Sequence, residues 1–264
     1  MIRDKILKPL TGRISYFKWR NHEILRIEAL SDAVFAFAIT LVVVSLEVPV
    51  TFHELIQSMY GMVGFAICFM FLFLIWHQQY LFFRHFGLRD RTTLALNAAL
   101  LFTVLFYVYP LKFLFTLLTA GNHVMEHGEK IERIATFLEL RQLMAIYSGG
   151  LIAVYLTYMF LYLHVSRKKE TLGLNHIEQF HLRTQVFKNI LIMSFGVACL
   201  LLLVFVPDEN VFSTGLIFLF IYPALYIFFK YREKRLRRKV SAAELRSHHE
   251  IVEKSKRVDH HGNL

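Results

Sequence analysis

RIEALSDAVFAFAITLVVVSLEVP, residues 26–49, is the first strongly apolar stretch of this 264-residue chain. Its length suits a membrane-spanning helix, which needs about 20 apolar residues. It nevertheless begins with Arg26, Ser31 and Asp32, and Glu47 stands near its end. Ionisable side chains within a membrane segment are costly and usually face protein or water, where they mark functional sites. The stretch therefore predicts a membrane helix with one face turned away from lipid.

Five further apolar runs follow. Hydrophobic residues make up 56% of the chain, whereas soluble domains contain about 45–50%. The predicted spans cover residues 33–50, 58–83, 93–119, 142–165, 188–206 and 211–230. The WHQQ stretch at residues 76–79 is unusually polar for lipid, which favours contact with protein. We therefore expect an all-α membrane protein with six transmembrane helices in each subunit.

The basic residues predict the orientation. The net charge is +10, but these residues lie between and after the apolar runs, which argues against a nucleic-acid partner. Of the 30 Lys and Arg residues, 26 fall on one side of the predicted spans. That side is expected to be cytoplasmic and to hold both chain ends. The six-helix transmembrane domain is expected at residues 1–231, with a cytoplasmic segment at 1–25 and a basic cytoplasmic tail at 232–264.

Thirteen histidines raise the question of a metal site. Only His123 and His127 have a four-residue spacing of the kind used by helical metal sites, with Glu126 beside them. They lie in an acidic external loop, for which a solvated surface is the better interpretation. The chain shows no nucleophile motif and no phosphate-binding loop, so we predict neither an enzyme nor a cofactor nor a small-molecule substrate.

One face of the first span combines apolar residues with a hydroxyl. Phe37, Leu41 and Val44 follow the i, i+4, i+7 spacing of one helical face, and Thr40 lies beside them. Around a symmetry axis, copies of this face would form apolar rings and a hydroxyl ring. Such a hydrophobic constriction can gate or filter ions.

The polar start of the span allows two interpretations. Ser31 and Asp32 suit a helix beginning, because their oxygens accept hydrogen bonds from free backbone N–H groups and meet the positive end of the helix dipole. Alternatively, Arg26 folds back onto Asp32 or onto a neighbouring helix and anchors the cytoplasmic mouth of a pathway.

The same residues resemble a known family. RIEALSDAVFAFAIT is similar to the Arg-x-x-x-Phe-Ser-Asp signature of the transmembrane protein 175 family of potassium channels, in its bacterial single-repeat branch. The resemblance continues through Thr40 to an apolar run closed by an acid and a proline. It implies a homotetramer in the lipid bilayer of a bacterial inner membrane, with K⁺ as the permeant ion. The pore-lining positions carried over are Phe37, Thr40, Leu41 and Val44, and the polar network behind the pore is Arg26, Ser31 and Asp32.

Two positions depart from the family pattern. Leu30 replaces the usual Phe of the signature, which is a modest change in packing. Phe37 replaces the more usual aliphatic residue at the narrowest ring, where four aromatic rings could offer π-faces to a cation. Two other hypotheses remain open at this stage: a proton- or ion-coupled transporter in which Asp32 titrates, and a membrane scaffold or enzyme without transport.

Overall fold

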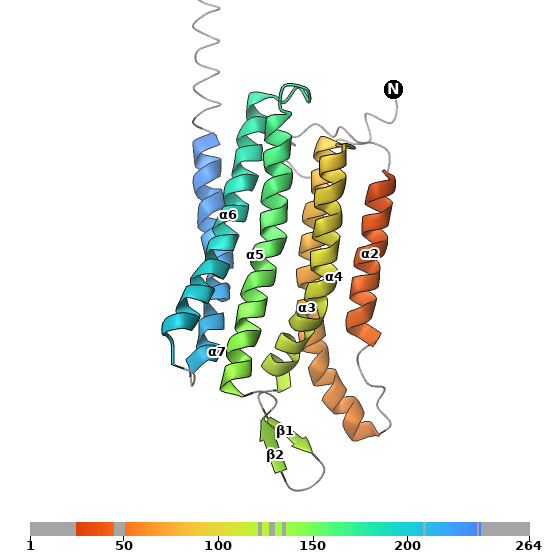
Figure 1. The fold of residues 1–264 in the computed structure, drawn as a ribbon, viewed down its shortest axis with the longest axis vertical. Helices are drawn as coiled ribbons and strands as arrows, with labels where there is room; N and C mark the ends of the chain where they lie inside the picture. The colour runs from red at the N-terminus through yellow and green to blue at the C-terminus, as the bar shows by residue number, and fades with distance from the viewer. Residues whose placement is uncertain are drawn as a thin grey trace, which may run out of the picture.

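The helices of this protein run side by side in a bundle. The computed structural model describes residues 25–44, 51–120, 123–126, 130–133, 136–207, 210–236 and 238. In Figure 1 successive long helices point in alternating directions along the vertical axis. The start of the first described helix and the end of the last lie at the same end of the bundle (Figure 1). This arrangement matches the alternation of spans that the sequence predicts.

The described part of the chain contains nine named elements and a further helical stretch at residues 221–236. The helices are α2 (Arg26–Val44), α3 (Phe52–Phe86), α4 (Arg91–Ala120), α5 (Phe137–Arg167), α6 (His176–Phe205) and the short α7 (Val211–Thr214). The 3₁₀ helix η2 (Gly215–Phe220) follows, and residues 221–236 continue as α-helix. Between α4 and α5, the antiparallel strands β1 (His123–Glu126) and β2 (Lys130–Arg133) form a hairpin. This hairpin projects from the end of the bundle opposite the start of α2 (Figure 1).

Local sequence signals fix where the helices begin and end. Gly87 follows α3 with a φ of 58°, a conformation that suits glycine and allows the chain to turn sharply after the helix. Asp90 then precedes α4 and accepts hydrogen bonds from the backbone N–H and the hydroxyl of Thr93. Thr136 and Glu139 form a reciprocal capping box at the start of α5. The short link between α3 and α4 is therefore shaped by a glycine and a capping carboxylate.

Aromatic side chains fill the core between α3 and α5. Phe82, Phe83, Phe86 and Tyr162 are buried and pack against one another at centroid separations of 5.4–6.1 Å. The buried hydroxyl of Tyr158 donates to the backbone carbonyl of Ile75 at 2.5 Å. This pairing satisfies a polar group that would otherwise be costly to bury. These side chains therefore form part of the packed core between α3 and α5.

Five helical segments in the described part of the chain are long and apolar enough to cross a membrane. They are Gly64–Phe86, Arg91–Leu111, Phe137–Arg167, His176–Phe205 and Gly215–Leu236. Each overlaps one of the predicted spans. The first predicted span, 33–50, overlaps α2, which is not among the five and whose described part ends at Val44.

Two features differ in detail from the prediction. Helix α6 begins at His176, twelve residues before the predicted span, because the polar stretch before the apolar run is also helical. The β1–β2 hairpin adds a small extended element to the otherwise helical fold. Helix α6 packs against α5, and the hairpin projects from the other end of the bundle (Figure 1).

Candidate functional site

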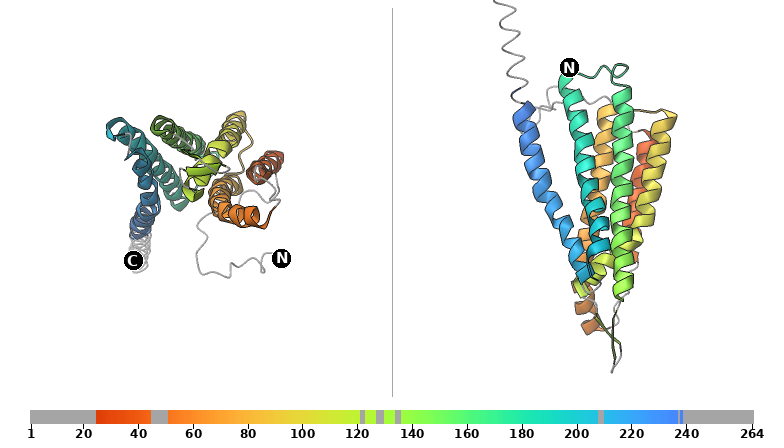
Figure 2. Two further views of the ribbon diagram at one scale, coloured as in Figure 1. Left: turned by 90° about the horizontal axis from the view of Figure 1, so that it is seen from below. Right: turned by 60° about the vertical axis from the view of Figure 1, so that its left-hand side comes forward.

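Helix α2 has one covered face and one open face. It packs against α3 and α4 and lies at the edge of the bundle in both the side view and the end-on view (Figures 1 and 2). Phe35, Ala38 and Val42 are buried on the covered face. Ala33 and Phe37 are exposed on the other, and Phe37 leaves 56% of its surface uncovered. An aromatic side chain is thus presented on the open face at mid-helix.

Ser31 connects the covered face to two neighbouring helices. Its hydroxyl donates to the backbone carbonyl of Ile27 at 2.7 Å and accepts from the side-chain amide of Asn97 on α4 at 2.9 Å. The side-chain oxygen of Asn97 in turn accepts from the amide of Gln79 on α3. All three residues of this chain, Ser31, Asn97 and Gln79, are at most 2% exposed. A buried polar chain of this kind joins α2, α3 and α4 at one level of the bundle.

Asp32 makes a second contact between helices. The indole N–H of Trp76 on α3 donates to its carboxylate at 2.7 Å, although Asp32 is exposed. Arg26 is also exposed, and in the described part of the chain it makes neither a hydrogen bond nor an ion pair with Asp32. The interpretation of Ser31 and Asp32 as the beginning of the helix is wrong, because α2 already begins at Arg26 and both residues lie in its second turn. They contact neighbouring helices instead, and in the described part of the chain Arg26 does not join them.

The predicted pore residues occupy three different settings. Phe37 and Thr40 lie on the open face of α2. The hydroxyl of Thr40 donates to the carbonyl of Ala36 at 2.9 Å, so its lone pairs stay available. Leu41 is partly buried and packs against the core. The side chain of Val44 lies outside the residues that the structure describes.

A second polar cluster lies at the turn between α3 and α4. The Asp90 carboxylate is 2.7 Å from His164 Nε2 and 3.4 Å from Lys168 Nζ, both at the end of α5. Burial alone would raise the pKa of Asp90, but hydrogen bonds from Thr93 and His164 and the charges of His164 and Lys168 lower it to about 2. The carboxylate is therefore ionised at neutral pH and ties the α3–α4 turn to α5.

The site includes residues that the sequence did not single out. Asn97 is the central member of the buried chain, and its one visible signal is an amide within an otherwise apolar run of α4. The prediction that WHQQ contacts protein is supported by three of its four residues, because Trp76, Gln78 and Gln79 all bond to other helices. His77 is the exposed member of that stretch.

The weak metal hypothesis gains no support from the fold. His123 belongs to strand β1, so the helical spacing assumed for His123 and His127 does not apply to it; His127 itself lies outside the described residues. Within the described ranges, no group of three or more potential metal ligands comes together.

The chain is similar to several known channels. The family model described as "Endosomal/lysosomal potassium channel TMEM175" matches residues 26–110. A potassium channel of Marivirga tractuosa is 34% identical over 241 residues, which cover 89% of this chain and 98% of that relative. The matched region begins at Arg26, the first residue of α2, and includes both polar contacts of that helix.

Two crystal structures share the fold. The T38A variant of the potassium channel MtTMEM175, solved with a nanobody fusion, is 33% identical and superposes with a TM-score of 0.71, covering 85% of this chain and 100% of the other. A TMEM175 homologue from Chamaesiphon minutus, described as a lysosomal potassium-selective channel homologue, is 21% identical with a TM-score of 0.51, covering 76% of this chain and 96% of the other. Because its sequence identity is only 21%, the second structure is evidence for the fold alone.

Proposed function

This chain belongs to the TMEM175 family of potassium channels, and on that premise we propose that it conducts K⁺ as a homotetramer through a pore lined by α2. It is an integral membrane protein, as its apolar helices indicate. The family assignment also confirms that the chain is not an enzyme and that it uses no cofactor beyond the permeant ion.

The open face of α2 carries the proposal. Because α2 lies at the edge of the bundle, Phe37 and Thr40 are exposed, and four copies around an axis would bring them together (Figure 1). Leu41 and Val44 continue the predicted lining. In the single chain Leu41 is partly buried, so it would contribute the edge of its side chain to the wall.

Phe37 is the proposed constriction. A ring of apolar side chains opposes ion passage because it excludes the water that a cation would carry with it. Aromatic faces also attract a cation when they are turned toward it. Thr40, one turn further along, offers hydroxyl lone pairs because its proton is already donated to Ala36. Together they would form an apolar ring followed by an oxygen ring, in place of a filter made of backbone carbonyls.

Arg26, Ser31 and Asp32 are proposed to act outside the ion path. Ser31 reaches Asn97, and Asp32 accepts from Trp76, so both hold α2 at a fixed rotation against α3 and α4. The alternative of a coupled transporter that uses Asp32 is disfavoured because the matched family and relative are potassium channels. Arg26 belongs to the same polar segment and is exposed at the beginning of α2.

The membrane topology is part of the proposal. Six spans place residues 1–25 and the basic tail at 232–264 in the cytoplasm of a bacterium, with the channel domain at 1–231 in the inner membrane. In this topology, the end of the bundle where α2 begins is cytoplasmic. The same end holds Arg89, Asp90 and Lys168. The last helix continues at least to Leu236 and packs Arg232 onto Thr184 of α6, so the beginning of the tail extends the bundle.

Ion flux into liposomes tests the constriction. We expect purified protein to pass K⁺, and Phe37→Asn to raise the flux several-fold and weaken discrimination against Na⁺, because an amide hydrates the ring. Phe102→Asn makes the same chemical change at an exposed phenylalanine of α4 and should leave the flux near the wild-type level. Intact tetramers that pass no ions in any variant, or equal effects of the two substitutions, would refute the proposal.

A further inference from the structure

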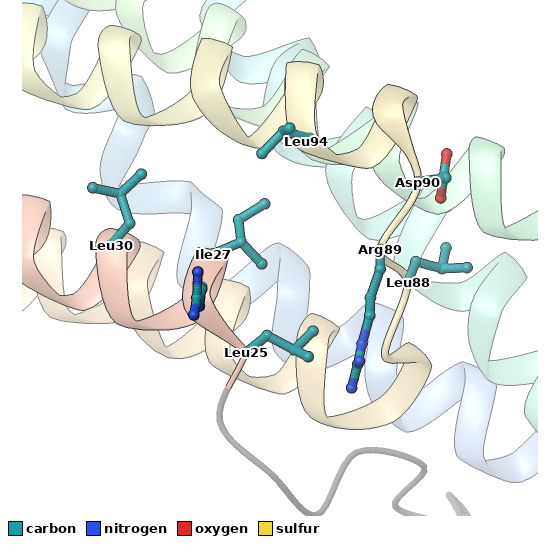
Figure 3. Close-up of a pocket in the computed structure, with 8 residues that line it drawn as sticks. Leu25, Ile27, Leu30, Leu88, Arg89, Asp90 and Leu94 are labelled. Carbon is teal, nitrogen blue, oxygen red and sulfur yellow. The ribbon is translucent and has the colours of Figure 1, made fainter.

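A cleft lies at the end of the bundle where α2 begins. It has a volume of about 580 Å³ and lies between the start of α2, the α3–α4 turn and the first turn of α4 (Figure 3). Five of its lining residues are aliphatic, namely Leu25, Ile27, Leu30, Leu88 and Leu94, and the other three are Arg26, Arg89 and Asp90. The cleft thus combines an aliphatic lining with three charged residues.

The two arginines supply the positive charge of the cleft. Both are exposed, and neither makes an ion pair or hydrogen bond in the described part of the chain. In Figure 3, Arg89 extends along the cleft toward Leu25, whereas the carboxylate of Asp90 points away from it. Asp90 is already engaged by Lys168, His164 and Thr93. The cleft therefore presents a net positive mouth above an apolar floor.

We propose that this cleft binds an anionic phospholipid. The phosphate would lie between Arg26 and Arg89, and an acyl chain would cover Leu30 and Leu94, which are 57% and 53% exposed. Guanidinium groups form strong charge-assisted hydrogen bonds with phosphate oxygens. Basic residues beside membrane spans attract anionic headgroups for the same reason. The position at the end of the spans puts the charges at headgroup depth and the leucines at acyl-chain depth.

A lipid bound in the cleft would contact α2 as well as the neighbouring helices. Leu25, Arg26, Ile27 and Leu30 come from the first turns of that helix, and the remaining lining residues come from the α3–α4 turn and α4. A lipid in the cleft consequently bridges α2 to its neighbours on the same side as the Ser31–Asn97 contact. Lipid binding is a separate property from ion conduction, and it can be measured without any measurement of ion flux.

Native mass spectrometry of the purified protein tests the site. The protein is exchanged into a neutral detergent with phosphatidylglycerol, phosphatidylcholine or inorganic phosphate, so that the anionic lipid is separated from both a neutral lipid and a free anion. We expect retention of phosphatidylglycerol. Arg89→Gln should weaken retention by roughly five- to tenfold, since each basic residue near a headgroup contributes about that factor. Arg91→Gln, two residues away and outside the cleft lining, is the charge-matched control.

A second pair of variants changes shape without changing charge. Leu94→Trp fills the cleft and should lower retention, whereas Phe102→Trp enlarges an exposed side chain on the same helix away from the cleft. Equal retention by Arg89→Gln, Leu94→Trp and both controls overturns the proposal, as does equal binding of phosphatidylcholine or of phosphate alone. Loss of oligomers in Arg89→Gln also overturns it and assigns the cleft to contact between copies of the chain.

Discussion

Two adjacent glycines of α5 face different surroundings. A Cβ added to Gly150 would lie 2.2 Å from two ring carbons of Tyr107 on α4, far inside contact distance. A Cβ added to Gly149 would meet no atom within 4 Å. The chain thus contains a matched pair, in which the same Gly→Ala change creates a clash at one position and none at the next.

The size of the clash depends on how firmly Tyr107 is held. Its ring is buried, its hydroxyl donates to the carbonyl of Tyr147 at 2.9 Å, and it packs against Phe71 at 6.1 Å. Overpacking costs about 1–3 kcal/mol, and disturbing the hydrogen bond adds about 1 kcal/mol. The higher helix propensity of alanine offsets up to about 1 kcal/mol of this destabilisation. We expect Gly150→Ala to destabilise by about 1–3 kcal/mol and Gly149→Ala to stabilise by up to about 1 kcal/mol.

Reversible unfolding in mixed micelles, followed by circular dichroism, measures both free energies. A double-mutant cycle with Tyr107→Ala adds a second check, because the cost of Gly150→Ala should largely disappear once the ring is absent. If Gly149→Ala and Gly150→Ala agree within about 0.5 kcal/mol, or if Tyr107→Ala leaves the cost unchanged, the assigned contact is wrong.

Three further predictions concern polar contacts. Asn97→Leu leaves a buried donor of Gln79 unpaired and should destabilise by about 1–3 kcal/mol in the same unfolding assay, whereas Thr103→Val on the same helix removes only an exposed intrahelical bond and should change little. The pKa of Asp90 is about 2 in the folded protein against an ordinary 3.8, so the ionised carboxylate stabilises the fold fully above pH 3.8 and loses this effect toward pH 2. The difference in unfolding free energy between wild type and Asp90→Asn should therefore shrink by at most about 2 kcal/mol between pH 5 and pH 2. A difference that stays constant over this range would contradict the prediction. Arg141 donates to the carbonyls that end α6, so Arg141→Gln should speed amide hydrogen exchange in its last turn, and unchanged exchange there would exclude this capping role.

The order of spans and the special character of the first helix were predictable from the sequence. Long apolar runs dictate helices in a membrane, since backbone groups there must pair within the segment. The polar start of α2 and the apolar face of Phe37 are local patterns, so they can be recognised without tertiary information. The likeness to the TMEM175 family rests on the same few residues and is confirmed by the comparisons.

The partners of those polar residues were not predictable. Ser31 and Asn97 are 66 residues apart, and nothing in either local sequence identifies the other. The start of α6 was also missed, because a hydropathy pattern finds the apolar length of a helix and not its polar extension, here from His176. The assignment of Phe37, Thr40, Leu41 and Val44 to the pore stays a prediction, since it concerns a surface between copies of the chain.

The hydrogen bonds that Ser31 and Asp32 make to other helices have a mechanical consequence. Ser31 and Asp32 are consecutive residues, so the directional bonds to α4 and α3 lie at one level, near the helix start. Further along, Phe35, Ala38 and Val42 pack by apolar contact, which permits sliding more readily than a hydrogen bond does. A tilt of α2 about Asp32 would move Phe37, which lies about 7.5 Å further along the helix at 1.5 Å per residue. A tilt of about 10° would displace Phe37 by about 1 Å. In the homotetramer proposed above, a displacement of that size would change the width of the constriction.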